Sequence, residues 1–483
     1  MTTNTPVRVR IAPSPTGYLH VGVGRTAVFN WLLARHTGGK YLVRIEDTDQ
    51  QRNRPELIQP ILNALKWMGI ESDEPEVRQS TRLENYKEYA QKILDSGYGY
   101  RCFCTPEELK EAREKSRKEK GIQQYDRRCL RLSDDEIKQR LDDGQKYAIR
   151  IKVPEGETHF TDLISGNLTR NNKEIEDFII ARSDGSATYQ LAVVVDDHNM
   201  GITHVIRGND HITNTFKQII LYRALGFEIP AFGHIPMILR PDKRKISKRL
   251  GDKDVNEYSA EGILPEALFN YLCTLSWSPK QDSEIFTVEE LIEIFTLDNF
   301  NASNSIFDEK KLLAFNKEHI KKKSDHELAT MVAPLLVDAD YTTKYWLETR
   351  WDYLRKIVGA LKERVHRITD FVSMSGYFFS SDFAYEEKAA KKHFKPEAAD
   401  RLTELADRFE QLPEFTLDNV EQALTELAEE KDIGRAKYIH PTRLAISGTS
   451  AGPGLFDLLV ILTKRVVVER MRKAAEYIRV GNV

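Results

Sequence analysis

Cysteine is scarce in this chain of 483 residues, and long apolar runs are absent. Only four cysteines occur, and three of them, Cys102, Cys104 and Cys129, fall within one region. This distribution disfavours a disulfide framework and suits a reducing compartment with a local metal or redox site. No apolar run approaches the roughly 18–20 residues that span a bilayer, and no basic segment leads into an apolar one at the start. We therefore expect a cytoplasmic protein.

An excess of one charge is also lacking, because the formal net charge is −3 at pH 7. The field of the whole protein therefore gives no support to a nucleic-acid partner. The segment 382–432 is acidic, whereas the last part of the chain is basic. A polyanion-binding face and a solvated helix surface both stay open for this basic part. Its basic residues include Arg435, Lys437, Arg443, Lys464, Arg465, Arg470, Arg472 and Lys473.

The chain has no internal repeat, and its beginning alternates strand and helix patterns. Val7–Ile11 alternates apolar and charged residues, a Pro/Gly loop follows, and Thr26–Ala34 has the apolar period of a helix. Tyr41–Ile45 is typical of a second, buried strand. Two further β-branched segments, Leu191–Asp197 and Thr203–Arg207, are expected to be strands of the same parallel sheet. The order favours a doubly wound nucleotide fold.

The expected fold class is α/β: a Rossmann-type doubly wound parallel sheet with an inserted α+β subdomain, followed by an all-α helical C-terminal half. A charged helix at Glu107–Lys120 and a strand at Lys146–Ile151 mark the insertion. The expected boundaries are 1–99 and 186–255 for the two halves of the Rossmann domain and 100–185 for the insertion. Helical regions follow at 256–325 and 326–483, the latter with a division near 376.

Two short motifs carry the chemistry. Pro13–Gly22 ends in a Gly-Tyr-Leu-His turn that would place His20 and exposed backbone N–H groups at a helix N-terminus, where phosphate is favoured. Far downstream, Lys245–Arg249 reads Lys-Ile-Ser-Lys-Arg, and its two lysines could follow the charge that develops on departing phosphates. Separately, the first motif also fits a helix cap and the second a solvated loop. Together they predict the two halves of one nucleotide-triphosphate site.

This pair of motifs resembles class I aminoacyl-tRNA synthetases, and more closely the bacterial-type glutamyl-tRNA synthetases. Val23 replaces the final His of the first motif, and Ile246 and Arg249 replace Met and the last Ser of the second. The likeness covers almost the whole chain. It extends to the runs Ile45–Asp49, Thr188–Ala192, Val195–His198 and Val205–Gly208.

The resemblance implies the site residues. His20, Lys245 and Lys248 would be catalytic, within an ATP site made of Thr16, Gly17, His20, Gly22, Asp210, Lys245, Ser247 and Lys248. The glutamate pocket would contain Arg10, Ala12, Ser14, Glu46, Tyr189 and Arg207. Chemically, glutamate requires an acid such as Glu46 for its ammonium and a bidentate guanidinium, from Arg207 or Arg10, for its side chain. The alternative is structural: each acidic strand end would be an ordinary helix cap, and each Arg would form a surface ion pair of little energetic weight.

The implied activity is ATP-dependent ligation of L-glutamate to tRNA(Glu) through a glutamyl-adenylate, with Mg²⁺ accompanying ATP. By the same resemblance, 100–185 would bind the acceptor end, 256–325 the stem, and 326–483 the anticodon, with Arg355, Arg364 and Arg367 as unranked readers. The family suggests a monomer. Whether tRNA(Gln) is also charged stays open.

Three rival functions can be weighed against these motifs. A glutaminyl-tRNA synthetase has related signatures but a neutral substrate side chain, so Arg207 and the helical C-terminal half favour glutamate. A nucleotidylyltransferase without a tRNA partner would need neither the insertion nor the long helical region. A non-catalytic RNA-binding relative would be expected to lack His20, Lys248 or Glu46, and all three are present.

The cysteine region permits a zinc site. Cys102, Cys104 and Cys129 supply three thiols, and tetrahedral zinc needs four donors. Some relatives with zinc have a His two residues after the third Cys, but this chain has Arg131 there, which cannot ligate. Tyr125, four residues before Cys129, is the substitute we consider. Zinc and simply packed thiols both stay open.

Overall fold

The structure is a computed structural model that describes residues 6–49, 52–120, 124–246 and 251–481. It comprises two compact units. Unit 1 consists of residues 1–258 and 268–309, and unit 2 of residues 259–267 and 310–483. In the described part of the chain, no helix is both long and apolar enough to cross a membrane.

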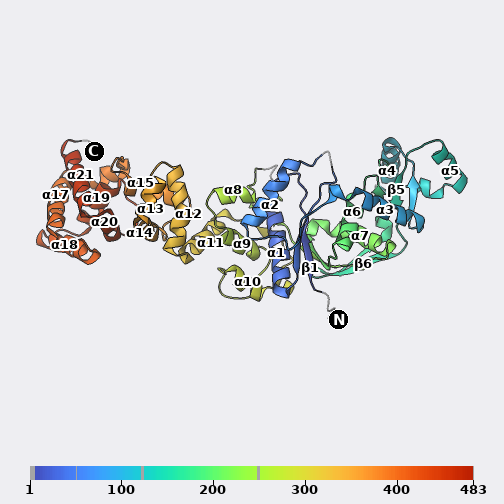
Figure 1. The fold of residues 1–483 in the computed structure, drawn as a ribbon, viewed down its shortest axis with the longest axis horizontal. Helices are drawn as coiled ribbons and strands as arrows, with labels where there is room; N and C mark the ends of the chain where they lie inside the picture. Colours follow the sequence, from blue (N-terminus) through green and yellow to red (C-terminus); the bar gives the residue numbers. More distant parts are fainter. Residues whose placement is uncertain (1–5, 50–51, 121–123, 247–250, 482–483) are drawn as a thin grey trace. The chain divides into compact units, whose positions relative to one another are not determined.

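Unit 1 contains a central, mainly parallel sheet (Figure 1). β1 (Arg8–Ile11), β2 (Lys40–Ile45) and β3 (Val77–Arg78) pair in parallel in the order β1-β2-β3. β9 (His204–Gly208), β10 (Ala231–Ile235) and β6 (Glu157–Asp162) also pair in parallel, and β7 (Gly166–Asn171) joins β6 antiparallel. The two runs meet beside β1, where the Thr203 backbone N–H donates to the Arg8 carbonyl at 3.0 Å. The predicted α/β class is confirmed, and β6 and β7, from within 100–185, extend this sheet.

Helices flank this sheet. α1 (Val21–Thr37) lies on one side of β1, and α6 (Tyr189–Asn199) and α7 (Ile212–Ala224) lie on the other (Figure 1). A buried cluster that includes Leu191, Val195 and Phe216 fills the space around α6 and α7. The other helices of the first 300 residues are α2 (Ile58–Trp67), α3 (Leu83–Asp95), α4 (Pro106–Lys120), α5 (Asp134–Asp142), α8 (Val255–Ala260), α9 (Pro265–Thr274) and α10 (Val288–Ile294).

One predicted strand is wrong. Leu191–Asp197 belongs to the helix α6, and all seven of its side chains are buried. A helix that is buried on every side shows no amphipathic period, so a short run of Val and Leu cannot be told from a buried strand by its pattern.

The middle segment contains a second sheet in the order β4-β5-β8, antiparallel throughout. Its strands are β4 (Gly99–Cys102), β5 (Ala148–Ile151) and β8 (Ile179–Ala181). The predicted charged helix and the strand near Lys146 correspond to α4 and β5. A two-stranded pair, β11 (Ile238–Leu239) with β12 (Ser305–Ile306), completes the described strands.

In unit 2 the described elements are helices around one core. Leu354, Ile357, Val358 and Leu361 of α14 are buried in it, as the amphipathic pattern requires. Part of the basic C-terminal segment is structural, because the buried Arg470 donates to the Ile446 carbonyl. The helices are α11 (Glu309–Lys322), α12 (Asp325–Asp338), α13 (Lys344–Thr349), α14 (Trp351–Leu361), α15 (Asp370–Phe379), α16 (Glu387–His393), α17 (Pro396–Gln411), α18 (Leu417–Glu430), α19 (Ala436–Ser447), α20 (Leu455–Leu462) and α21 (Lys464–Arg479).

Candidate active site

A cavity of about 940 Å³ lies in unit 1 where the strands β1, β2 and β9 end. Ligands of open α/β sheets bind at the carboxyl ends of the strands, so this position agrees with the fold. Of the fourteen residues predicted for the ATP and glutamate sites, all those that the structure describes line this one cavity: Arg10, Ala12, Ser14, Thr16, Gly17, His20, Gly22, Glu46, Tyr189, Arg207, Asp210 and Lys245. The remaining two, Ser247 and Lys248, lie outside the described residues.

His20 is the N-cap of α1. Its Nδ1 accepts a hydrogen bond from the Gly22 backbone N–H at 3.1 Å. A Cβ at position 22 would lie 3.0 Å from the imidazole ring, which explains why a glycine follows the His so closely. Burial and the charge of Lys245 lower the pKa of His20, so the ring is neutral at pH 7. Because Nδ1 accepts, Nε2 carries the proton and can donate to a ligand.

Lys245 brings a positive charge to the same cavity. Its Nζ lies 2.6 Å from Asp210 Oδ2, and more than half of the Lys245 side chain is exposed. A solvent-screened ion pair of this kind contributes little to stability and can rearrange when an anion binds. Asp210 therefore acts here as the partner of Lys245.

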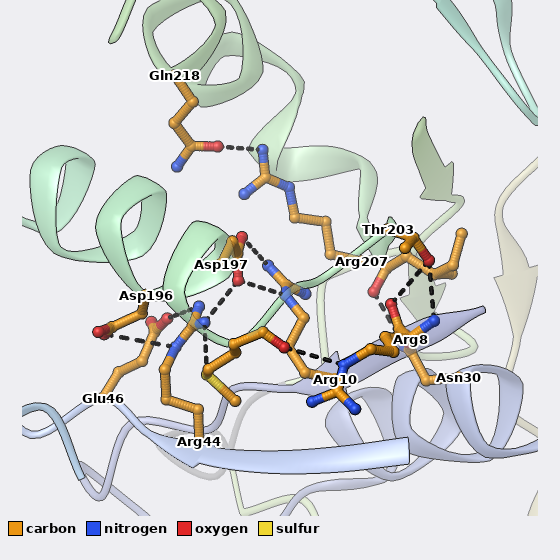
Figure 2. Close-up of polar contacts among 12 residues, drawn as sticks. Arg8, Arg10, Asn30, Arg44, Glu46, Asp196, Asp197, Thr203, Arg207 and Gln218 are labelled. Carbon is orange, nitrogen blue, oxygen red and sulfur yellow. Dashed lines mark hydrogen bonds and ion pairs between the residues drawn. The ribbon is translucent and has the colours of Figure 1, made fainter. Parts of the chain in front are cut away.

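A buried network of charges reaches the cavity through Arg10 and Glu46. Figure 2 shows Asp197 between two arginines: Arg10 Nε lies 3.0 Å from Asp197 Oδ1, and Arg44 Nη1 lies 2.5 Å from the same oxygen. Arg44 Nη2 also contacts Glu46 Oε1 at 3.1 Å. Burial alone would raise the pKa of Asp197, but the two guanidiniums hold it at about 2. Arg10 thus donates hydrogen bonds to Asp197 from both Nε and Nη2.

Glu46 differs from Asp197 in the direction of its pKa shift. Burial raises the pKa of Glu46 above its ordinary value, although Arg44 and Arg10 oppose the rise. A carboxylate at the rim of a buried ion-pair network, lining the cavity, can accept hydrogen bonds from a ligand ammonium. Such a contact would offset the unfavourable burial of the charge.

Arg207 is held quite differently from Arg10 and Arg44. Only 6% of it is exposed, and its described contacts are neutral. Nη2 donates to Thr215 Oγ1 at 2.6 Å and, as Figure 2 shows, to Gln218 Oε1 at 2.7 Å. Its Nη1 is buried without a hydrogen-bond partner, and no carboxylate among the described residues forms an ion pair with it. Since a guanidinium stays charged when buried, Arg207 presents an uncompensated cation to the cavity.

Tyr189 and His211 complete this end of the cavity. The Tyr189 hydroxyl lies 3.1 Å from His211 Nδ1. Burial and the nearby Arg207 lower the pKa of His211 to about 4, so this ring adds no charge at pH 7. Arg207 thus supplies the positive charge at this end of the cavity.

Several residues of this site were not predicted. Asp197 stands inside a quoted motif run and Arg44 inside the predicted strand Tyr41–Ile45, yet no role was assigned to either. Thr215, Gln218 and His234 surround Arg207, and no pattern in the sequence signals them. Their positions follow from the packing of α7 and β10 beside β9.

The three clustered cysteines are brought together as predicted. The sulfur atoms of Cys102, Cys104 and Cys129 lie within 4.8 Å of one another. The Tyr125 hydroxyl lies 3.6 Å from Cys102 Sγ and 3.8 Å from Cys104 Sγ. Sulfur and oxygen donors around one tetrahedral zinc ion are separated by distances of this order, so the four side chains fit a metal.

Comparison with known proteins identifies the family. A family model described as tRNA synthetases class I (E and Q), catalytic domain, matches residues 6–314, and an anticodon binding domain model matches residues 327–475. The chain is 43% identical over 475 residues to Glutamate–tRNA ligase 2 of Thermoanaerobacter pseudethanolicus, with 98% of each chain covered. It is 42% identical over 478 residues to the glutamate–tRNA ligase of Geotalea uraniireducens, covering 99% of this chain and 100% of that one.

A solved structure supports the same assignment. The glutamate tRNA ligase from Elizabethkingia meningosepticum, in complex with its amino acid, superimposes with a TM-score of 0.88 at 33% identity, covering 98% of this chain and 99% of that one. The resemblance inferred from the motifs is confirmed by both comparisons. The chain therefore belongs to the glutamate–tRNA ligase family of class I tRNA synthetases.

Proposed function

We propose that this chain ligates L-glutamate to tRNA(Glu), using ATP and releasing AMP and pyrophosphate. Membership of the family supports this activity. The observation that carries the proposal is the Arg207 guanidinium, which is buried, lacks an anionic partner in the described chain, and lines the same cavity as His20 and Lys245. A cationic pocket beside a phosphate-favouring helix end suits an acidic amino acid next to a nucleotide.

In the first step the α-carboxylate of glutamate attacks the α-phosphorus of ATP, and pyrophosphate leaves. No side chain acts as nucleophile, so the chain contributes alignment and preorganised charge. His20 Nε2–H donates to phosphate oxygens, the positive end of the α1 dipole favours their charge, and Lys245 and Lys248 stabilise the developing negative charge. Mg²⁺ bound with ATP supplies further charge neutralisation. Thr16, Gly17, Gly22, Asp210 and Ser247 complete the ATP site.

The amino-acid pocket takes both ends of the substrate. Glu46 accepts hydrogen bonds from the ammonium, and Arg207 donates from Nη1 to the side-chain carboxylate. Because Nε and Nη2 of Arg10 are bonded to Asp197, Arg207 and not Arg10 is the selective guanidinium. Arg10, Ala12, Ser14 and Tyr189 form the rest of the pocket wall.

In the second step the terminal 2′-hydroxyl of the tRNA attacks the glutamyl-adenylate. Residues 1–99 and 186–255 form the catalytic domain, and 100–185 holds the acceptor end. Residues 256–325 contact the stem, and 326–483, divided near 376, read the anticodon. A match to an anticodon binding domain over 327–475 supports the last assignment. We keep Arg355, Arg364 and Arg367 as candidate readers, together with a monomeric state and a cytoplasmic location.

Zinc is proposed as a structural ion of the segment 100–185. Cys102, Cys104, Tyr125 and Cys129 would hold it, and Arg131 would stay outside the ligand set. The ion would link β4 to the segment around Cys129. Elemental analysis of the purified chain decides between one zinc per molecule and packed thiols without metal.

The proposed function is tested by Arg207→Gln, which keeps hydrogen-bonding capacity but removes the charge. Glutamate-dependent ATP–pyrophosphate exchange, measured with tRNA present, should lose at least about a hundredfold in kcat/KM, because the substrate carboxylate loses its charged partner. The KM for ATP should stay the same.

Arg35→Ala is the matched control, because Arg35 pairs with Asp73 at 2.8 Å and does not line the cavity. An unchanged glutamate KM and turnover in Arg207→Gln would remove Arg207 from the pocket. Aminoacylation of purified tRNA(Glu) and tRNA(Gln) in parallel decides whether both are substrates.

A further inference from the structure

A buried chain of side chains stands behind Arg207. Asp162 stands at the end of β6, and its Oδ2 lies 2.6 Å from Nδ1 of His234 on β10. His234 Nε2 accepts from Arg207 Nε at 3.3 Å and lies 2.9 Å from Thr215 Oγ1. Asp162 is 2% exposed and His234 is 1% exposed, so water does not compete for these contacts. Neither residue lines the cavity.

The protonation states follow from the donors and acceptors. Burial would raise the pKa of Asp162, but the hydrogen bond with His234 and backbone N–H groups lower it, so the carboxylate is ionised and only accepts. His234 Nδ1 must therefore carry the proton. Its Nε2 is then the acceptor that Arg207, which can only donate, requires.

This arrangement fixes the guanidinium without neutralising it. Arg10 and Arg44 each contact Asp197 directly and are compensated within the protein. Among the residues that the structure describes, Arg207 donates only to the neutral acceptors His234, Thr215 and Gln218, while the Asp162 carboxylate stays one imidazole ring away. The guanidinium charge of Arg207 can therefore form an ion pair with an anionic ligand.

We infer that Asp162 and His234 are positioning residues for glutamate selection. Asp162 holds His234 in the tautomer whose Nε2 accepts from Arg207, and His234 in turn orients the guanidinium toward the substrate carboxylate. This role rests on the proposed function, in which Arg207 binds the side chain of glutamate.

Asp162→Asn separates this role from a purely structural one. Asp162 Oδ1 accepts from the backbone N–H groups of Ile164 at 3.0 Å and Ser165 at 2.8 Å. An Asn can keep these bonds with its own Oδ1, which directs its NH₂ group at His234 Nδ1. The ring must then change tautomer and direct an N–H at Arg207 Nε, as the corresponding substitution does in serine proteases.

We expect Asp162→Asn to raise the glutamate KM at least about tenfold and to leave the ATP KM unchanged. L-glutamine should then compete with L-glutamate more strongly than it does in the parent enzyme. Asp184→Asn is the control, because Asp184 caps an exposed turn through Ser186 and has no His partner. An unchanged glutamate KM in a folded Asp162→Asn enzyme would overturn the inference.

Two substitutions at His234 test the tautomer itself. Gln places its carbonyl oxygen near the position of Nε2, whereas Asn reaches only the position of Nδ1. His234→Gln should therefore keep more glutamate affinity than His234→Asn, and Asp162→Asn should add little once His234 is Gln. If Asp162→Asn raises the glutamate KM by the same factor in the parent enzyme and in His234→Gln, Asp162 serves in turn capping alone.

Arg207→Gln distinguishes this inference from the proposed function. If Arg207→Gln raises the glutamate KM and Asp162→Asn does not, only the positioning role fails. If Arg207→Gln is without effect, the pocket assignment fails and the positioning role fails with it. Circular dichroism and the thermal midpoint of each variant show whether it is folded, and where Asp162→Asn unfolds, the Gln and Asn variants of His234 decide.

Discussion

At the scale of single residues, Glu46 and Arg207 show how burial prepares a site for one ligand. Both are ionisable groups with little exposure that line the cavity, and burial shifts the pKa of each toward its neutral form. A ligand with an ammonium and a carboxylate relieves both unfavourable charges at once. Glutamate has these groups, and glutamine lacks the second carboxylate.

Glu46 makes the amino-acid site sensitive to pH. In the proposed site the ionised carboxylate binds the ammonium, and its pKa is raised, so protonation begins at a higher pH than for an ordinary Glu. The glutamate KM of the parent enzyme should therefore rise as the pH is lowered, and the rise should begin at a higher pH than an ordinary Glu would give. Glu46→Gln should have a higher KM that lacks this acid dependence. An acid limb that persists in Glu46→Gln would assign it to another group.

At the scale of elements, the N-terminus of α1 combines a cap and a ligand site in one side chain. His20 Nδ1 satisfies the Gly22 N–H, which leaves Nε2 for phosphate. Asn is a strong N-cap, whereas Ala caps poorly, so His20→Asn and His20→Ala separate the two roles.

His20→Asn should keep the stability of α1 and still lower the rate of ATP–pyrophosphate exchange by about 10²–10³, because one preorganised donor is lost. His20→Ala should show the same loss of rate together with about 0.5–2 kcal/mol less stability. Thermal unfolding and exchange kinetics of the two variants provide the measurement. A normal rate in His20→Asn would show that His20 serves only as a cap.

The elements also show what a local pattern can and cannot predict. β1, α1 and β2 are set apart by Pro and Gly between them, and their predicted types are confirmed. α6 was predicted as a strand because its apolar run is short and β-branched. Its helical state depends on burial from every side, and burial is a property of the packed fold.

At the scale of the whole molecule, each unit has its own buried core, so ligands of the cavity should stabilise unit 1 selectively. Glutamate and a non-hydrolysable ATP analogue, each at about 100 times its dissociation constant, should each add about 2.7 kcal/mol to the stability of unit 1. Calorimetric unfolding should then show one transition that shifts with ligand and one that does not.

Two substitutions assign these transitions. Asp197→Asn leaves Arg10 and Arg44 under-compensated and should destabilise unit 1 by about 3–5 kcal/mol. Because the folded pKa of Asp197, about 2, is below its unfolded value, its contribution is present at neutral pH and is lost as the pH falls toward that folded value. Leu405→Ala, in the core of unit 2, should lower the other transition by about 2–5 kcal/mol. A single transition that both variants shift equally would contradict independent units.

The sequence by itself determined the fold class, the family and twelve of the residues that line the cavity, because strand and helix patterns and the two motifs are local properties of neighbouring residues. Only the tertiary structure decided which arginine is left for the substrate. Arg10 and Arg207 each lie one residue before the end of a strand beside the cavity. The partner of Arg10, Asp197, is 187 residues away, and the neutral acceptors around Arg207 come from α7 and β10. Whether a buried charge is compensated depends on such distant contacts, and no local pattern records them.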